Sequence, residues 1–171
     1  ICPFNGDISQ WNTSSVKRMA HAFHQSSFVG DLSRWDTSNV RDMAHMFAYS
    51  QFNGNLSTWN TSRVTNMVGV FAHSRFNGCI ASWDVTQVRS MSNMFTCSPF
   101  NGDISEWSPA LLDDASSMFY GSAFNQDVSS WKLPQLRNAY WMFRSSPFNG
   151  DLSGWDVSQA DTGFMLDSPT F

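Results

Sequence analysis

The sequence predicts an α/β repeat solenoid of seven coils, with one short parallel strand and one short helix in each coil. Three observations support this fold class: a fixed period, an apolar pattern that recurs within each period, and turn residues at the same place in every period. The opening phrase FNGDISQW returns along the whole chain with small changes, as in FNGDISEW and FNGDLSGW. Such self-similarity at a fixed spacing is typical of repeat architectures.

The period is 24 residues, as the step from Phe4 to Phe28 shows, and it continues without an insertion. The coils begin at Phe4, Phe28, Phe52, Phe76, Phe100, Phe124 and Phe148. Coils stack regularly when each closes with the same path length, so we expect one solenoid domain over residues 1–171. Positions are numbered below by the first coil, so that position 17 means residues 17, 41, 65 and so on.

Each coil opens with a turn of the type FNGD. Asn and Gly tolerate a positive φ, so the pair Asn5-Gly6 and its repeats are expected at a tight corner. Stacked asparagines at position 5 can hydrogen-bond from coil to coil and to the loop backbone. An aspartate column follows at position 7, and we expect its carboxylates to bond their own loops.

The next segment, QWNTS in the first coil, alternates with a period of two. This alternation predicts a short strand with Trp11 and Thr13 pointing inward. The outward strand positions are Gln10, Asn12, Ser14, Arg34, Asp36, Ser38, Thr58, Asn60, Ser62, Ser82, Asp84, Glu106, Lys132 and Asp156.

The last segment places apolar residues at Val16, Met19, Ala22 and Phe23. Steps of 3, 3 and 1 match one stripe of a short helix, and Ser14 is a reasonable N-cap two residues earlier. The recurring Phe and Trp should form aromatic columns along the solenoid axis. Each buried ring contributes about 1.5–3 kcal/mol by its area.

The chain resembles the BspA-like leucine-rich-repeat surface-protein family. The stretch FVGDLSRWDTSNVRDMAHMF, Phe28 to Phe47, follows the family phrase F-N-x-D-[IL]-S-x-W-[DN]-[TV]-S-x-V-x-x-M-x-x-M-F nearly throughout. The resemblance implies a right-handed, leucine-rich-repeat-like solenoid on a secreted or cell-surface protein. It also implies adhesion, recognition or surface structure as the role, and it carries over no catalytic residues.

The last coil departs from this pattern. Its end, QADTGFMLDSPTF, loses the helix spacing, and Asp167 stands where Phe is expected. The chain begins at Ile1, just before the Phe of a repeat, so we expect a mature product or a fragment. Since a solenoid needs covered ends, we expect neighbours at both: further repeats, head-to-tail copies of this chain, or other subunits.

Bulk composition excludes several function classes. A net charge of −4 and a pI near 5.3 predict no nucleic-acid binding and no anionic-membrane binding. No apolar run approaches the roughly 20 residues of a membrane span, so no membrane insertion is expected. Motifs for nucleophilic, metal-dependent or phosphate chemistry are absent, and we expect no enzyme and no cofactor.

Several candidate sites have two interpretations. Cys79 and Cys97 form either a bridge between adjacent loops or free, partly buried thiols, and Cys2 is then left over. His21 and His45 share a repeat position beside His24, either as a metal pair or as exposed surface histidines. The aspartate column is either a calcium ladder or a set of turn residues, and its breaks at Asn55 and Cys79 favour the turns.

Two further patterns concern the outer surface. Thr13, Thr37 and Thr61 resemble an ice-binding ladder, but their alternation points them inward. Three sequons, at Asn12, Asn55 and Asn60, have two interpretations: N-glycosylation acceptors, if the protein is secreted by a eukaryote, or a coincidence that the recurring W-[DN]-[TV]-S phrase generates. N-glycans are therefore the only attached groups that the sequence suggests.

These observations lead to two functional hypotheses. The first is a non-enzymatic extracellular or cell-surface structural module, part of a larger array or filament. The alternative is an adhesion or recognition module that binds a glycan or a protein on its strand face. The outward strand positions lack the Trp, Tyr and Arg residues that dominate binding hot spots, Arg34 aside, and this favours the structural module.

Overall fold

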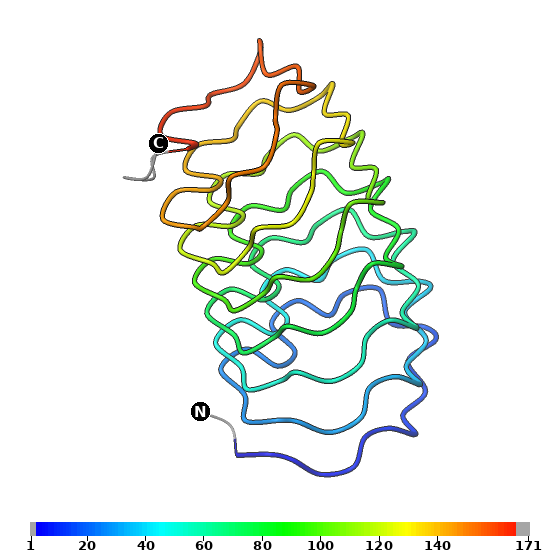
Figure 1. The fold of residues 1–171 in the computed structure, drawn as a ribbon. Coiled ribbons are helices and arrows are strands. Elements are labelled where there is room, and N and C mark those ends of the chain that lie inside the picture. Colours follow the sequence, from blue (N-terminus) through cyan, green and yellow to red (C-terminus); the bar gives the residue numbers. More distant parts are fainter. Residues whose placement is uncertain (1–2, 167–171) are drawn as a thin grey trace.

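The computed structural model describes residues 3–166. The chain winds into a stack of similar coils, with the first coil at one end and the last coil at the other (Figure 1). One core runs through the stack and repeats with the 24-residue period, because buried Phe and Trp recur at the same positions in successive coils. The predicted repeat architecture with an aromatic interior is confirmed at this level.

No helix and no strand is assigned anywhere in residues 3–166, so the α/β class is not confirmed. The coils are instead joined by single parallel β-bridges at position 18. These bridges are Arg18–Asp42, Asp42–Asn66, Asn66–Ser90, Ser90–Asp114, Asp114–Asn138 and Asn138–Asp161. Parallel pairing of neighbouring coils was predicted, but its place was wrong: the bridges lie seven residues after Trp11 rather than in the segment that contains it.

The predicted helices are also absent from the described residues. In the first coil the backbone N–H groups of Met19, His21, Phe23 and Gln25 donate to carbonyls of the second coil, at 2.8–2.9 Å. An α-helix would direct these N–H groups to carbonyls four residues earlier in the same segment. The intervening N–H groups close short turns, for example Ala22 to Met19 at 3.1 Å.

Positive φ values explain why this segment is not helical. Positions 21 and 25 take the left-handed conformation in coil after coil, as at His21 (φ 59°) and Gln25 (φ 54°). A positive φ at the third residue is what a type II turn requires. Each coil contains two such turns, and they direct alternate backbone N–H groups toward the neighbouring coil. The apolar spacing of 3, 3 and 1 follows from these turns.

The aromatic columns pack as expected. Phe28 and Phe52 stack with ring centroids 6.4 Å apart, and Trp59 and Trp83 stack at 6.3 Å. The Phe at position 23 bridges the two columns, since Phe47 lies 4.5 Å from Phe52 and 6.1 Å from Trp59. The threonines at position 13 point inward, as predicted, and all three are buried.

Two side-chain ladders reinforce the stack. From the second coil on, each Trp indole at position 11 donates to a carbonyl of the preceding coil, such as Trp59 Nε1 to Leu32 O at 2.9 Å. The asparagine ladder predicted at position 5 is confirmed: Asn77 Oδ1 accepts from the backbone N–H of Asn101 at 2.9 Å, and Asn101 serves Asn125 in the same way at 2.8 Å.

The glycines at position 6 correct one prediction. None of them has a positive φ among the described residues; Gly69 and Gly121, at positions 21 and 25, do. A Cβ at Gly78 would lie 2.9 Å from the Phe76 ring. Glycine at position 6 therefore makes room for the first aromatic ring of its coil, whereas left-handed backbone occurs at positions 21 and 25.

The last coil is one residue shorter than the others. Regular coils pair position 19 with a carbonyl 23 residues on, as Ala115 N does with Asn138 O, but Ala139 N bonds Asp161 O, 22 residues on. Asp161 thus fills position 18, and the residue at position 17 is missing. In this register Leu166 occupies position 23, where the preceding coils have Phe. That position was expected at Asp167, which lies outside the described residues, so the expectation is corrected.

Candidate interaction surface

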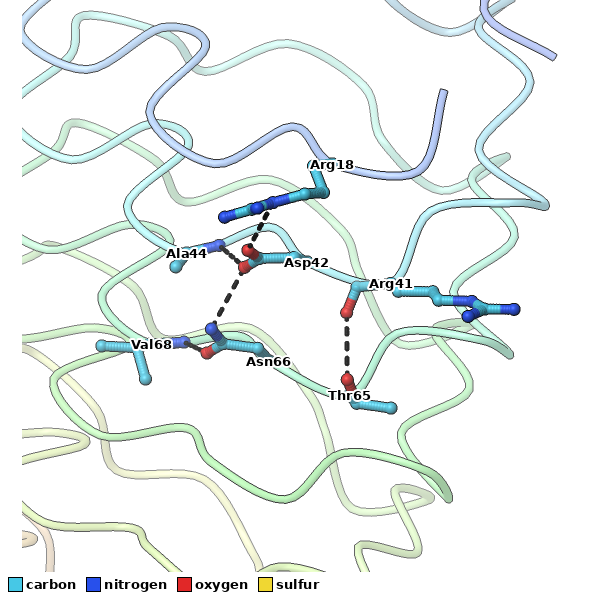
Figure 2. Close-up of polar contacts among 7 residues, drawn as sticks. All are labelled: Arg18, Arg41, Asp42, Ala44, Thr65, Asn66 and Val68. Atoms are coloured by element: carbon cyan, nitrogen blue, oxygen red, sulfur yellow. Dashed lines mark hydrogen bonds and ion pairs between the residues drawn. The ribbon is translucent and has the colours of Figure 1, made fainter. Parts of the chain in front are cut away.

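The bridge column carries a chain of polar side chains along one edge of the stack. Asn66 Nδ2 donates to Asp42 Oδ1 at 3.1 Å, and Arg18 Nε lies 3.5 Å from Asp42 Oδ2 (Figure 2). Each of these acceptors also closes its own turn, since Ala44 N donates to Asp42 Oδ1 and Val68 N to Asn66 Oδ1, both at 3.1 Å. Position 18 therefore fixes the backbone that follows it.

A β-turn precedes this column in every coil. Its first and last residues are at positions 13 and 16, with Val16 N donating to Thr13 O at 2.9 Å and Val88 N to Val85 O at 3.1 Å. The ends of a β-turn lie within about 7 Å of each other. Positions 12 and 17 therefore flank one turn, and their exposed side chains form two rows, one before the turn and one after it.

The row at position 17, which we name the basic row, carries four exposed cations. Its members are Lys17, Arg41, Thr65, Arg89, Asp113 and Arg137. Arg137 Nε lies 3.5 Å from Asp113 Oδ1, whereas Lys17, Arg41 and Arg89 make no ion pair within residues 3–166. In Figure 2 the Arg41 side chain extends away from the bridge column.

Two hollows interrupt the basic row where its side chains are short. One, of about 210 Å³, is lined by Arg89, Leu111, Asp113, Gln135 and Arg137. The other, of about 460 Å³, is lined by Arg41, Ser62, Arg63, Thr65 and Gln87. Both place guanidinium groups beside open, solvent-filled space, an arrangement suited to carboxylate or other anionic groups.

The row at position 12, which we name the acidic row, carries three aspartates and one lysine. Its members are Asn12, Asp36, Asn60, Asp84, Ser108, Lys132 and Asp156. Hydrogen bonds from Ser38 hold the pKa of Asp36 below its ordinary value, and Ser158 does the same for the pKa of Asp156. Each such bond occupies Oδ1, and these exposed carboxylates stay ionised at neutral pH.

The aspartates at position 7 act as turn residues, as predicted. Ser9 N donates to Asp7 Oδ1 at 2.9 Å, and Ser105 N to Asp103 Oδ1 at 2.9 Å. These backbone bonds lower the pKa of both carboxyls. Asn55 replaces Asp in the third coil and its Oδ1 accepts the same bond from Ser57 N at 2.9 Å, so an uncharged acceptor can take this role.

The predicted sequons lie on the surface. Asn12, Asn55 and Asn60 are all exposed. In Asn12 and Asn60 the Oδ1 atom accepts from the hydroxyl two residues later at 2.7 Å, Ser14 and Ser62 respectively. Glycosylation at these residues stays a prediction.

Cys79 and Cys97 are free thiols, and both are exposed. The structure therefore contains neither a disulfide between them nor the partly buried thiols that were the alternative. Cys2 lies outside the described residues.

The histidines stack on each other. His21 and His45 are nearly parallel, 5.0 Å apart, and His24 meets His21 edge-on at 5.4 Å. Burial, followed by repulsion from His21 and His24, lowers the pKa of His45. In the part of the chain that the structure describes, no group of three or more metal-binding side chains comes together.

The basic row was missed by the reasoning from sequence, although its signal was present. Position 17 was given no role of its own, and a net charge of −4 concealed a local row of cations. Reading the sequence in columns of 24 would have revealed Lys, Arg, Arg and Arg at one position. Net charge reports the whole molecule, whereas an interaction surface depends on where the charge lies.

Comparison with known proteins places this repeat in a family. The family described as "Mycoplasma protein of unknown function, DUF285" matches residues 2–77 and again residues 73–168. The chain belongs to this DUF285 family. No curated protein and no solved structure matches the DUF285 chain at the significance required. The two matches support a DUF285 repeat protein, and no helix within residues 3–166 is long and apolar enough to cross a membrane.

Proposed function

We propose that this chain is a non-enzymatic structural module of an extracellular or cell-surface array, in which further coils or subunits continue the stack at both ends. The finer expectations drawn from the BspA-like resemblance, a right-handed leucine-rich-repeat-like solenoid and a secreted or surface location, belong to this proposal. The observation that carries it is the state of the two outer faces compared with the internal joints between coils.

At the first coil, the face that an earlier coil would cover is open. Phe4 is 48% exposed and Trp11 is 61% exposed, although both belong to columns that are buried elsewhere. Within the described residues the Trp11 indole has no carbonyl acceptor of the kind that every later repeat Trp finds in the coil before it. A coil with the same pattern supplies both the aromatic cover and that acceptor.

At the last coil, the opposite face is open as well. Phe164 is 58% exposed and Leu166 is 41% exposed. This face presents the same kind of backbone donors that earlier coils direct to their successor, such as Met67 N to Ser90 O at 2.9 Å. The two faces are therefore complementary in the same way as any internal joint, which favours head-to-tail addition.

The test is the size of the chain in solution over a range of concentrations, by sedimentation velocity and light scattering. We expect species that grow beyond dimers, and we expect Trp11→Glu to abolish the growth by placing a charge in the joint. Tyr49→Glu is the matched control, because Tyr49 is 51% exposed but lies at a position where every coil borders solvent. A chain that stays monomeric at all concentrations, or equal behaviour of the two variants, contradicts continuation of the stack by copies of this chain.

A recognition role is the second candidate, and the basic row with its two hollows favours it. Anionic groups of a glycan or protein fit beside Arg41, Arg63 and Arg89. This surface follows the β-turn, so it differs from the strand face to which the alternative hypothesis assigned binding. Retention on an immobilised anionic polysaccharide that Arg89→Asp removes would support it, and equal retention of both chains would contradict it.

A further inference from the structure

We propose that one lateral face of the stack, formed by positions 20, 21, 24 and 25 of the first six coils, binds an extended acidic segment of a partner protein. We name it the aromatic face. It stays open whether or not coils are added at the two ends, so the inference is independent of the proposed function. Its basis is the set of residues that gather there, the way their rings are held, and the sign of their charge.

These four positions share one side of the stack because the backbone bonds between coils connect them. His21 N donates to Ala44 O at 2.9 Å, and His73 N donates to Thr96 O at 2.7 Å. Position 21 is thereby joined to position 20 of the next coil, and position 25 to position 24. Residues far apart in the sequence become neighbours along this face.

The residue types on the aromatic face differ from those elsewhere in the repeat. The face carries every tyrosine and every histidine of the chain, together with Trp141, which lies outside the Trp column at position 11. None of the 14 acidic residues and no lysine occurs there. Its large members, none of them buried, are His21, His24, His45, Tyr49, His73, Tyr120, Tyr140, Trp141 and Arg144. Many aromatic residues, an arginine and few charges are the composition of protein interface hot spots.

The rings of the first three coils form one connected group, which we name the imidazole cluster: His21, His24, His45, Tyr49 and His73. His21 stacks on His45 at 5.0 Å and meets His24 edge-on at 5.4 Å. Tyr49 stacks on His73 at 4.5 Å and meets His24 edge-on at 5.8 Å. Because neighbouring rings already restrict one another, a partner pays little side-chain entropy to bind them.

The orientation of the rings favours a protein segment over a sugar. Tyr49 lies nearly parallel to His73, with 7° between the ring planes. Tyr120 and Tyr140 stack on Trp141, with centroids 5.6 and 4.9 Å away. A sugar packs on an open ring face, whereas these faces are covered by neighbouring rings. The ring edges, which carry the positive part of the ring quadrupole, remain for carbonyl and carboxylate oxygens.

The sign of the charge favours an acidic partner. The aromatic face contains no acidic residue, whereas the whole chain has a net charge of −4. An acidic segment is therefore repelled by much of the surface but not by this face. The basic row is the other surface that attracts acids, and an Arg89 variant separates the two.

The length of the aromatic face fits an extended segment. Six coils spaced by about 4.8 Å extend over about 24 Å, and extended backbone covers about 3.3 Å per residue. About seven residues therefore span the face. Their carboxylates would lie over the imidazole cluster, and an apolar side chain would lie beside Tyr120 and Trp141.

Acidification strengthens this preference. Each imidazole that takes a proton gains a positive charge and a second N–H donor. Burial, followed by repulsion from His21 and His24, lowers the pKa of His45, so a lower pH is needed to charge that ring.

The charged groups around the imidazole cluster do not replace an acidic partner. Along the chain the nearest are Arg18, Asp42 and Arg75. Asp42 is engaged, because Arg18 Nε lies 3.5 Å from its Oδ2 and Ala44 N donates to its Oδ1. Arg75 follows His73 by two residues and adds a further cation.

The probe is a fluorescent peptide that repeats Asp-Ser-Leu, and its control repeats Asn-Ser-Leu. Binding is measured by anisotropy at about pH 7.5 and about pH 5.5. The histidine variant carries His21→Asn, His45→Asn and His73→Gln, which are residues that other coils hold at the same positions. Tyr49→Gln tests the aromatic contact, and Arg89→Asp is the matched change on the basic row. Circular dichroism and the denaturation midpoint check that each variant folds.

We expect the Asp peptide to bind about tenfold more tightly at the lower pH, and the Asn peptide to bind weakly at both. The histidine variant should lose the dependence on pH. Tyr49→Gln should weaken binding several-fold at both pH values, because tyrosines dominate such contacts. Arg89→Asp should bind as the unchanged chain does.

Three results would overturn the inference. One is equal binding of the Asp and Asn peptides in mild acid. Another is binding that is lost in Arg89→Asp but kept in the histidine variant, which assigns the acidic peptide to the basic row. The last is a sulfated polysaccharide that binds through the imidazole cluster of a chain that does not bind the Asp peptide; that outcome assigns the face to a glycan.

Discussion

The first coil and the fourth coil contain the same phrase, but their aromatic side chains are in opposite environments. Trp11 is 61% exposed and Trp83 is 3% exposed, although both occupy position 11 of their coils. Trp83 donates to Leu56 O at 3.0 Å and stacks on Trp59 of the preceding coil at 6.3 Å, whereas Trp11 stacks only on Trp35 of the following coil. Burial here is a property of the joint between coils, and a single coil has no core of its own.

The comparison also separates two kinds of position. Core positions repeat the same residue because both neighbouring coils impose the same contact. Edge positions such as 12 and 17 vary in charge from coil to coil, since solvent imposes no packing on them. The core residues therefore stay the same from coil to coil, whereas the charges at the edge differ from one coil to the next. Seven substitutions, in four groups, test how a residue's place in the stack decides its effect.

The largest effect is expected at the centre of the stack. Trp83→Ala removes a buried ring and leaves the Leu56 carbonyl without its indole donor, which should lower the free energy of unfolding by about 3–5 kcal/mol. Trp11→Ala is the matched change and should cost less than about 1 kcal/mol, because that ring is mostly in solvent. Urea denaturation of both variants measures the difference, and equal losses would mean that burial does not govern this column.

A smaller gain is expected where the asparagine ladder is interrupted. Val29 occupies position 5 of the second coil and has no side-chain oxygen to accept from the backbone N–H of Asn53. In the next coil, by contrast, Asn53 Oδ1 accepts from the backbone N–H of Asn77 at 2.8 Å. Val29→Asn should restore that bond and raise stability by about 1 kcal/mol. The reverse change, Asn101→Val, should lower stability by a similar amount. A loss in the second variant without a gain in the first would contradict this interpretation.

Left-handed backbone offers a smaller stabilisation. Ser145 has φ of 58° at position 25, where Gly121 stands one coil earlier. Left-handed backbone costs an L-residue about 1–2 kcal/mol, and glycine loses about 0.5–1 kcal/mol in chain entropy. Ser145→Gly should therefore stabilise by about 0.5 kcal/mol in thermal denaturation. Ser129→Gly is the control, because Ser129 has no positive φ, and this change should destabilise the fold. If both changes shifted stability in the same direction, the strain inferred at Ser145 would be refuted.

The smallest effect concerns pH. The pKa of His45 is lower in the folded chain than the ordinary value of about 6.5. The unfolded state therefore binds the proton more readily, and stability is lost as pH falls through about 6.5. His45→Asn introduces the residue that the fourth coil has at the same position, Asn93. The denaturation midpoint of this variant should change less between about pH 7.5 and pH 5.5 than that of the unchanged chain. An unchanged slope would show that His45 does not contribute.

The sequence predicts the columns of this molecule better than the backbone path between them. The period, the aromatic interior, the inward Thr13 column, the asparagine ladder and the turn role of Asp7 follow from residue type and spacing alone. Each depends on a local rule applied to a repeated position, and repetition multiplies the signal.

The path of the chain was harder to predict because an apolar stripe does not show where peptide groups point. Val16, Met19, Ala22 and Phe23 have helical spacing, but the N–H of Met19 leaves the segment for the next coil. Non-glycine residues such as Gln25 and Trp141 hold a positive φ, which no propensity rule assigns to them. The missing residue at position 17 of the last coil was likewise hidden, since it shifts register only after Ala160.

The direction of the hydrogen bonds between coils gives the whole stack an electrical polarity. The peptide groups that join positions 18 and 19 accept from the preceding coil through C=O and donate to the next coil through N–H, and those at 20–21, 22–23 and 24–25 do the same. Their dipoles add along the axis, as they do in an α-helix. The first-coil end is the negative pole, near Lys17 and Arg18, and the last-coil end is the positive pole, near Asp161. The bridge edge therefore carries cations at its negative end and an anion at its positive end, and two stacks that meet at like poles repel.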